Sequence, residues 1–417
     1  MAILGCIADD FTGASDAASF LVKGGMSVKL YNGIPGPLSS TETAQAIVIA
    51  LKSRSEDREK AVDDSLNAAD FLLSQGVRQI YFKYCSTFDS TPEGNIGPVA
   101  DALMEHLKVS CSLLCPSLPV NGRTVKNGML FVNGTPLDES HMKNHPLNPM
   151  WDCRIPELMK PQSKYPCKII TQSQIAEKEA SSLFSQKSGH FYLVPDYETD
   201  EDGAFIAEHF GGLTFLTGGS GLLSHLARRW SQTLDSLGFI PESKTDGKAL
   251  LIAGSCSKAT LEQIDWYKKQ GFPCCKLKPD YMLDGKQTLD EVWDFIKENT
   301  SKERSVLVYS SDTPEHVQQY QTLGRETVAG LLENAAACLA KRALDNGFTR
   351  IISAGGETSG AVTKGLGFCS YWMGESVAPG VPIMVPAERM DVRLILKSGN
   401  FGQTDFFTRA LDMTQRR

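Results

Sequence analysis

The chain has 417 residues, and its 41% hydrophobic content is enough for two separate cores. Its net charge of -7 and pI near 5.6 argue against the basic surface that nucleic-acid binding needs. No segment reaches the roughly 18 apolar residues of a transmembrane helix, and the first ten residues carry acids where a signal peptide carries bases. Eleven cysteines without paired spacing predict a reduced, cytoplasmic protein with no metal site of its own.

The first half of the chain alternates short apolar runs with helical patterns. It begins with an expected strand at 3–8 that ends in Asp9 and Asp10, followed by a helix to residue 23 and a strand at 27–31. This βαβ pattern predicts a parallel sheet. Ligands of such sheets bind beyond the carboxyl ends of the strands, where the two acids lie. One aspartate can cap the helix, which leaves the other for chemistry or a ligand.

Basic residues follow the next two expected strands, at 46–50 and 79–82. Arg54 and Lys83 end successive strands and can approach the sheet edge that carries the two aspartates. A single basic residue after a strand is more often simply solvated. Both side chains are donors only, as an anion requires. The pair therefore predicts that Arg54, with Lys83 as a second positive group, binds the carboxylate of a small acid.

A polar stretch with proline and glycine at 239–248 is the best candidate for a linker. It separates an expected first domain, 1–238, from a second βα series at 249–417. We expect an α/β fold of two domains, each with a mainly parallel sheet flanked by helices, and an active site in the cleft between them.

The stretch from Ile351 to Gly360 reads as a buried strand, a glycine turn and the start of a helix. Gly355 and Gly356 allow the turn, and Thr358 or Ser359 can cap the helix. Free N–H groups and the helix dipole at such a joint favour a phosphate, although an ordinary tight turn has the same pattern. Small and hydroxyl residues recur after two other expected strands, at 254–257 and 398–402. Three such loops along one sheet edge predict a nucleotide-phosphate cradle that includes Ser255 and Gly399.

Three runs of the sequence resemble the four-carbon acid sugar kinases: 7–16, 82–91 and 353–360. The resemblance implies that the first domain binds a four-carbon sugar acid and that the second binds ATP, with Mg²⁺ expected beside the nucleotide. The reaction that it implies is phosphorylation of the terminal hydroxyl of the acid. It also implies an acceptor site lined by Asp9, Asp10, Arg54, Lys83 and Arg123, and ATP contacts from Ser257, Glu357, Thr358, Ser359, Gly360 and Gly402.

Asp10 is our candidate for the base that orients or deprotonates the acceptor hydroxyl, with Asp9 as the second choice. Family members differ in their acid, so threonate and erythronate stay open as substrates beside the 3-oxo acid. A non-catalytic protein that senses nucleotide or sugar acid is a further alternative. A dehydrogenase is disfavoured because neither glycine turn has the Gly-x-Gly-x-x-Gly pattern. We expect small-molecule ligands only, without nucleic acid or membrane, and a homo-oligomer remains open.

Overall fold

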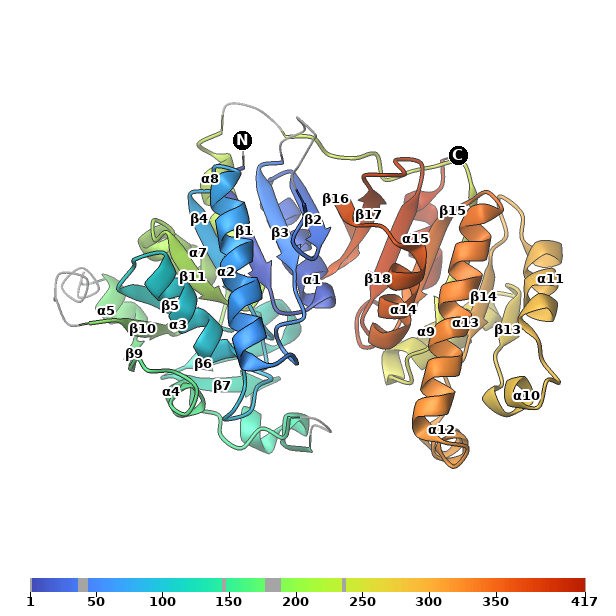
Figure 1. The fold of residues 1–417 in the computed structure, drawn as a ribbon, viewed down its shortest axis with the longest axis horizontal. Coiled ribbons are helices and arrows are strands. Elements are labelled where there is room, and N and C mark those ends of the chain that lie inside the picture. Colours follow the sequence, from blue (N-terminus) through green and yellow to red (C-terminus); the bar gives the residue numbers. More distant parts are fainter. Residues whose placement is uncertain (1, 37–43, 145–147, 177–188, 235–237, 417) are drawn as a thin grey trace. The chain divides into compact units, whose positions relative to one another are not determined.

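The computed structural model describes residues 2–36, 44–144, 148–176, 189–234 and 238–416 (Figure 1). The chain divides into two compact units, Met1–Phe239 and Ile240–Arg417. Both are built from strands and helices, as the α/β prediction requires. Among the described helices, none is both long and apolar enough to cross a membrane. The predicted linker at 239–248 and the active site between the domains stay predictions.

The first unit contains a parallel sheet whose described strands follow the order β2-β3-β1-β4-β11-β5-β10-β9. Every residue of β1, β3, β4, β5 and β10 is buried, which explains why these strands read as short apolar runs without alternation. The strands are β1 (Leu4–Ala8), β2 (Val28–Asn32), β3 (Ala46–Ala50), β4 (Gln79–Lys83), β5 (Cys111–Cys115), β9 (Cys167–Ile170), β10 (Phe191–Pro195) and β11 (Phe215–Gly218).

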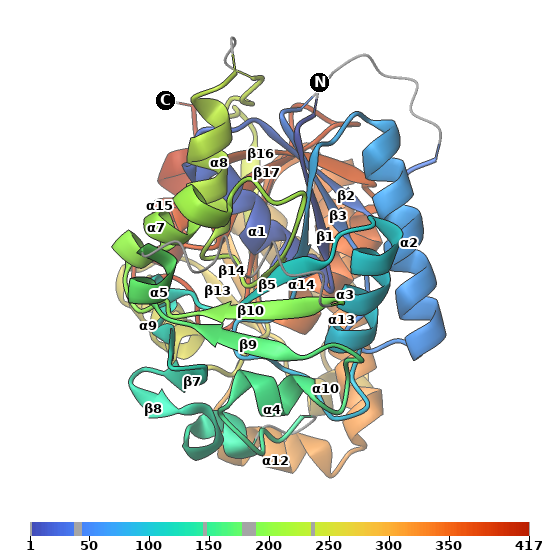
Figure 2. The ribbon, with the colours of Figure 1, turned by 90° about the vertical axis from the view of Figure 1, so that its left-hand side faces the viewer.

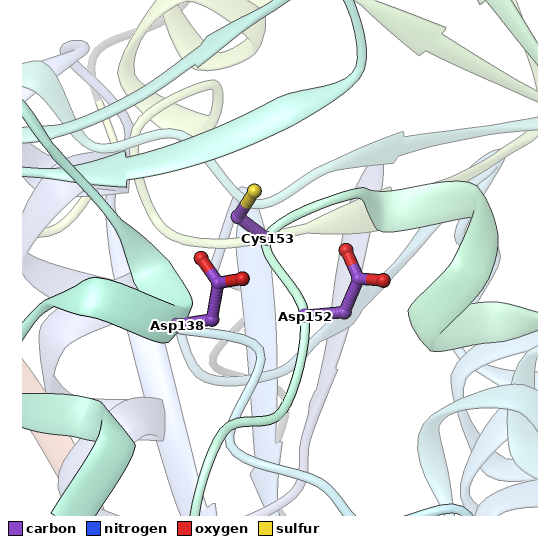
Figure 3. Close-up of side chains that lie close together, drawn as sticks. All are labelled: Asp138, Asp152 and Cys153. Atoms are coloured by element: carbon purple, nitrogen blue, oxygen red, sulfur yellow. The ribbon is translucent and has the colours of Figure 1, made fainter.

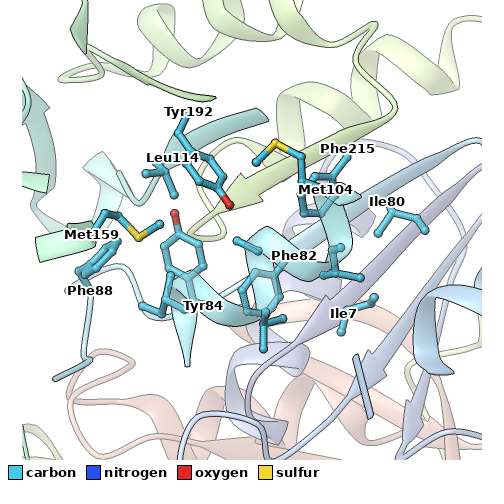
Figure 4. Close-up of a cluster of buried hydrophobic side chains, with 14 of the residues drawn as sticks. Ile7, Ile80, Phe82, Tyr84, Phe88, Met104, Leu114, Met159, Tyr192 and Phe215 are labelled. Atoms are coloured by element: carbon cyan, nitrogen blue, oxygen red, sulfur yellow. The ribbon is translucent and has the colours of Figure 1, made fainter. Parts of the chain in front are cut away.

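Two groups of helices pack on this sheet (Figure 2). One group is α1 (Phe11–Lys23), α7 (Asp200–Phe210) and α8 (Leu223–Ser231), and the other is α2 (Arg58–Ser74) and α3 (Ile96–His106). The core beneath α3 brings Phe82, Tyr84 and Met104 together (Figure 4). Smaller elements complete the unit: η1 (Pro119–Asn121), an antiparallel sheet of β6 (Arg123–Lys126), β7 (Met129–Val132) and β8 (Thr135–Pro136), then η2 (Leu137–Glu139), η3 (His141–Asn144), α4 (Ile155–Met159) and α5 (Gln172–Ala176).

The second unit has a mixed sheet in the order β13-β14-β12-β15-β18-β17-β16. The strands from β13 to β18 in this order are parallel, whereas β17 runs antiparallel to both of its neighbours in the unit. The sequence analysis did not anticipate the hairpin that β16 and β17 form. The strands are β12 (Lys248–Ala253), β13 (Cys274–Lys276), β14 (Val306–Tyr309), β15 (Phe348–Ala354), β16 (Ser370–Ala378), β17 (Val381–Pro386) and β18 (Arg393–Lys397).

Helices cover this second sheet as well. Ala249, Leu251 and Ala253 point to one face of β12 and pack in a single cluster with residues of α9 and α15. The long helix α13 packs against α14, and both contact β15. The helices are α9 (Lys258–Lys269), α10 (Pro279–Leu283), α11 (Leu289–Asn299), α12 (Pro314–Gln321), α13 (Arg325–Asp345), α14 (Gly356–Leu366) and α15 (Phe406–Thr414).

Candidate functional site

In the first unit, Arg54 holds the two adjacent aspartates that follow β1. Its Nε and Nη2 atoms donate to the two carboxylate oxygens of Asp9 at 2.8 Å each, and Nη2 also donates to Asp10 at 3.0 Å. The structure therefore brings together the three residues that the sequence placed at one sheet edge. Two nitrogens of the Arg54 guanidinium are committed to protein carboxylates, so this arginine is largely neutralised within the site.

Asp10 caps helix α1. Its Oδ1 accepts the backbone N–H of Gly13 at 2.9 Å, and its Oδ2 accepts the hydroxyl of Thr12 at 2.7 Å. The prediction that one of the two aspartates caps the helix is confirmed, and the capping residue is Asp10. Burial works to raise the pKa of Asp10, but the cations of Arg54 and Lys83 outweigh it and the pKa is lowered. Asp10 is thus a carboxylate at neutral pH.

Lys83, the last residue of β4, lies beneath the first turn of α1. A Cβ atom at Gly13 would come within 2.6 Å of its Nζ, so only glycine leaves room for the ammonium there. Lys83 is buried and donates to the carbonyl of Tyr84 at 3.2 Å. Burial works to lower its pKa, but Asp9, Asp10 and Asp16 raise it above the usual value. The site therefore contains a buried ammonium with three carboxylates around it.

Asp16 and Ser220 belong to this cluster, although the sequence analysis gave them no role. The Ser220 hydroxyl, in the loop after β11, donates to Asp16 Oδ2 on α1. Burial raises the pKa of Asp16 against the opposing effect of Lys83. Nothing in the pattern of the chain singled out Asp16, because an aspartate on a helix usually faces water and its burial is visible only in the structure.

Arg123, the first residue of β6, is the third cation of this region. Its Nη1 donates to the carbonyl of Asn121, and it forms no ion pair among the described residues. Burial lowers the pKa of its guanidinium, with partial compensation from Cys85 and Asp16. Unlike Arg54, it therefore keeps a charge that no neighbouring carboxylate directly neutralises.

In the second unit, the three predicted loops meet at the carboxyl ends of the neighbouring strands β12, β15 and β18. A Cβ atom at Gly254 would lie 2.1 Å from Thr358 Oγ1, and one at Gly399 would lie 2.4 Å from Ser255 Oγ. The Ser257 hydroxyl donates to the carbonyl of Gly399 at 2.6 Å. Gly254 and Gly399 are required because the loops contact each other there through backbone and hydroxyl groups.

The N-terminus of α14 lacks a side-chain cap. Gly355, at φ +130°, occupies the capping position, and Thr358 and Ser359 lie inside the helix. The prediction that one of these hydroxyls caps the helix was therefore wrong. The Ser359 hydroxyl points instead to the hydroxyl of Ser353. The first N–H groups of an uncapped helix need an outside acceptor, and an anion such as phosphate supplies it.

Lys397, at the end of β18, holds the loop at 398–402 in place through hydrogen bonds. This buried ammonium donates to the Thr260 hydroxyl at 2.9 Å and to the carbonyls of Ser398 and Gly399 at 3.2 and 2.8 Å. Burial lowers its pKa to about 8. Gln263 of α9 donates to the carbonyls of residues 401, 402 and 403. The loop that includes Gly402 is therefore held in place through its backbone carbonyls.

A separate group of side chains, Asp138, Asp152 and Cys153, has potential metal-ligand atoms within 4.8 Å of one another (Figure 3). Both oxygens of Asp152 accept hydrogen bonds from Arg154, at 3.0 and 2.6 Å. Burial and the nearby Asp138 raise the pKa of Cys153 to about 11, so its thiol stays protonated. Metals bind the thiolate, and we assign no ion to this group.

Family models match both units of the chain. A sugar-binding N-terminal domain matches residues 4–226, and a nucleotide-binding C-terminal domain matches residues 250–407. The 3-oxo-tetronate kinase of Actinobacillus succinogenes is 41% identical over 99% of both chains. That of Haemophilus influenzae is 39% identical over 99% of this chain and 100% of its own. The chain belongs to the four-carbon acid sugar kinase family.

A solved structure from Salmonella typhimurium, described as a putative tRNA synthase, is also similar. It has a TM-score of 0.90 and 38% identity, covering 98% of this chain and 99% of its own. As a member of the kinase family, this chain is a phosphotransferase with a sugar-binding and a nucleotide-binding domain. The nucleotide-binding domain of a kinase implies ATP.

Glycines on the exposed side of α14 give a direct test of the phosphate cradle. A Cβ atom at Gly356 or Gly360 would have no neighbouring atom within 4 Å, so valine fits at either residue without a clash in the protein. We expect Gly356→Val and Gly360→Val to raise the KM for ATP roughly tenfold or more, since a branched side chain covers the N–H groups. The unfolding free energy should change by about 1 kcal/mol or less.

Gly330→Val is the matched control, because Gly330 lies on an exposed face of α13 and is equally open. It should leave the KM for ATP unchanged in steady-state assays of ADP release. Normal ATP affinity in a folded Gly360→Val protein would remove α14 from the nucleotide site.

Lys397 predicts a pH dependence of stability. Its pKa is about 8 when folded and 10.5 ordinarily, so the unfolded chain binds the proton more strongly between these pH values. Below pH 8 the lysine therefore lowers the unfolding free energy by its full amount. The unfolding free energy then increases as the pH rises toward 10.5. Lys397→Met should remove this slope, which amounts to about 3 kcal/mol at most. Urea titrations of both proteins from pH 7 to 10.5 measure it.

The exposed Lys364 of α14 provides the comparison. Lys364→Met should leave the pH dependence as in the wild type. Parallel curves for the wild type and Lys397→Met would show that Lys397 is not titrating in this range.

Proposed function

We propose that this protein transfers the terminal phosphoryl group of ATP to the 4-hydroxyl of 3-oxo-tetronate. The observation that carries the proposal is the uncapped N-terminus of α14 beneath three loops of small and hydroxyl residues. The charged cluster in the sugar-binding unit and the full-length relatives named 3-oxo-tetronate kinase support the acid as acceptor. Threonate and erythronate are the alternative acceptors within the same family.

The nucleotide contacts follow from the three loops. We assign the phosphates to the free N–H groups of the first turn of α14, at 356–358, and to the hydroxyls around them, because the N–H of Gly355 donates to the carbonyl of Lys397 at 2.8 Å. The complete set is Ser255, Ser257, Gly355, Gly356, Glu357, Thr358, Ser359, Gly360, Gly399 and Gly402.

Glu357 fits a magnesium ion that arrives with the nucleotide. It is the one carboxylate in the three loops, it is exposed, and it stands in the first turn of α14. Mg²⁺ typically takes one or two protein carboxylates and the phosphate oxygens. When bound, the ion would neutralise charge on the phosphates while the α14 N–H groups and the loop hydroxyls orient them.

In the acceptor site, Asp10 is the residue that can orient the attacking hydroxyl. Its side chain is 28% exposed, whereas that of Asp9 is 4% exposed and enclosed by Arg54. Kinases commonly align the acceptor hydroxyl with an aspartate, and Asp10 is ionised. Asp9 then keeps Arg54 in place, and Lys83 supplies positive charge beneath both acids.

A tRNA substrate, which the description of the Salmonella protein would suggest, does not fit this proposal. The net charge of -7 provides no basic surface for a polyanion. A coupled assay of ADP release over four-carbon sugar acids and their 3-oxo forms tests the proposed reaction. Consumption of ATP that does not depend on any of these acids would refute it.

Asparagine substitutions separate the two aspartates. Asp10→Asn should reduce kcat about a hundredfold or more with both KM values nearly unchanged, because the hydroxyl loses its charged partner. Its melting temperature should fall only modestly, since asparagine caps a helix about as well as aspartate but loses the ion pair with Arg54.

Asp9→Asn should instead destabilise the protein, by about 3 kcal/mol, because it leaves the Arg54 guanidinium without its two-pronged partner. Thermal unfolding and steady-state kinetics on both variants measure the contrast. A folded Asp10→Asn enzyme with normal kcat would eliminate Asp10 as the orienting group.

A further inference from the structure

Three buried polar atoms on different elements of the first unit have no hydrogen-bond partner among the described residues. They are Asp16 Oδ1 on α1, Ser117 Oγ after β5 and Arg123 Nε at the start of β6. Ser117 is fully buried and Asp16 is 9% exposed. Proteins pair nearly all buried polar groups, so atoms left without partners often indicate where a ligand binds.

Contacts between their elements place these three residues in one region. Asp16 accepts the hydroxyl of Ser220, and a Cβ atom at the next residue, Gly221, would lie 2.3 Å from the carbonyl of Ser117. Leu118, which follows Ser117, exchanges two backbone hydrogen bonds with Arg123, at 2.8 and 3.1 Å. The three residues therefore lie on elements that contact one another in turn, from α1 through the loops after β11 and β5 to β6.

The charges of this region complement an acid. Arg54 is already matched by Asp9 and Asp10, and Lys83 faces all three aspartates. Arg123 has only Asp16 and Cys85 as charged or titratable neighbours that affect it, and it pairs with neither among the described residues. Arg123 is therefore the cation whose charge is available to a ligand carboxylate.

We propose that Arg123 binds the carboxylate of the acceptor and that Asp16 and Ser117 bind its 2-hydroxyl, so that these three residues select a 2-hydroxy acid. The proposal rests on the proposed function and moves the carboxylate from Arg54 to Arg123. A guanidinium offers paired N–H donors to a carboxylate. The 2-hydroxyl of the acceptor can donate its proton to Asp16 Oδ1 and accept the proton of the Ser117 hydroxyl.

This assignment also orients the substrate. Asp10 and Asp16 are six residues apart along the start of α1, a rise of about 9 Å. With the carboxylate and the 2-hydroxyl held near Asp16, the opposite end of a four-carbon chain, the 4-hydroxyl, extends toward Asp10. The residue proposed to align that hydroxyl is thus near the other end of the bound acid.

Two substrate analogues test the assignment in the ADP-release assay. Erythrulose replaces the carboxylate of 3-oxo-tetronate with a hydroxymethyl group, and 4-hydroxy-3-oxobutanoate lacks the 2-hydroxyl. The wild type should prefer 3-oxo-tetronate over each by roughly a hundredfold in kcat/KM. Arg123→Ala should lose the preference over erythrulose only. Asp16→Asn and Ser117→Ala should lose the preference over 4-hydroxy-3-oxobutanoate only.

Stability distinguishes this role from a structural one. Ser117→Ala removes a hydroxyl without a partner among the described residues, and Asp16→Asn removes a buried charge while its amide oxygen can still accept from Ser220, so their melting temperatures should equal or exceed that of the wild type. Asp101→Asn is the matched control, because buried Asp101 accepts from Ser163, the Lys164 N–H and Tyr192. It should lower the melting temperature and leave both preferences unchanged.

The outcomes separate the two proposals. A wild-type enzyme that uses none of the three compounds refutes the proposed function. An active wild type whose preferences survive in Arg123→Ala, Asp16→Asn and Ser117→Ala overturns this inference alone. If Arg123→Ala does not fold, Arg123→Lys replaces it. An Arg123→Lys enzyme that keeps the full preference for 3-oxo-tetronate over erythrulose, with an unchanged KM for the acid, would contradict the carboxylate assignment.

Discussion

Parallel strands present their carboxyl ends at one edge of a sheet, and the chemistry of each unit is assembled there. In the first unit, the residue after β1, the segment after β3 and the last residue of β4 supply Asp9, Arg54 and Lys83, which are distant in sequence but belong to neighbouring strands. In the second unit, the loops after β12, β15 and β18 meet in the same way. The order of the strands, rather than any single motif, determines which loops can share a ligand.

Electrostatic balance differs between the two edges. The acceptor side gathers opposite charges, and a guanidinium bound to two carboxylates holds Asp9 and Asp10 close to the buried ammonium of Lys83. The nucleotide loops instead use glycine, serine and threonine, so their positive potential comes from backbone N–H groups and the α14 dipole. An anion with several phosphates suits the second arrangement, and a small acid with hydroxyls suits the first.

Much of this architecture could be predicted from the sequence, because buried parallel strands are apolar throughout and their limits are marked by polar residues. The strand at 46–50 has the predicted bounds, and the strand predicted at 79–82 extends one residue further. The hairpin of β16 and β17 was missed although Pro379 and Gly380 mark its turn, because Glu375 and Ser376 interrupt the apolar run of β16. The cap of α14 was assigned wrongly because the sequence does not reveal that Gly355 adopts φ +130°.

The residues of the candidate site could be predicted from the sequence only in part. Residues that end strands could be placed from the pattern of the chain, whereas Asp16 and Ser117 depend on tertiary neighbours. Asp16 lies on a helix, where an aspartate usually faces water, and its burial follows from the packing of α1 against the loop after β11. The run that contains Asp9 and Asp10 includes this residue, but only the structure distinguishes it from a solvated side chain.

Buried polar atoms without a hydrogen-bond partner gather near the carboxyl ends of the strands in the first unit, where they reduce the stability of the fold. Five buried side-chain atoms in the described part of the first unit have no partner, and four of them, on Asp16, Ser53, Ser117 and Arg123, lie in or beside the segments that follow β1, β3 and β5. Elsewhere, buried polar side chains such as Gln79 and Asp101 are satisfied by carbonyls, hydroxyls or N–H groups. A buried polar group that stays unsatisfied costs about 1–3 kcal/mol, and a ligand that supplies its partner recovers that free energy on binding. If these atoms bind the acceptor as proposed, they also provide selectivity, because an analogue without the matching group leaves them unpaired.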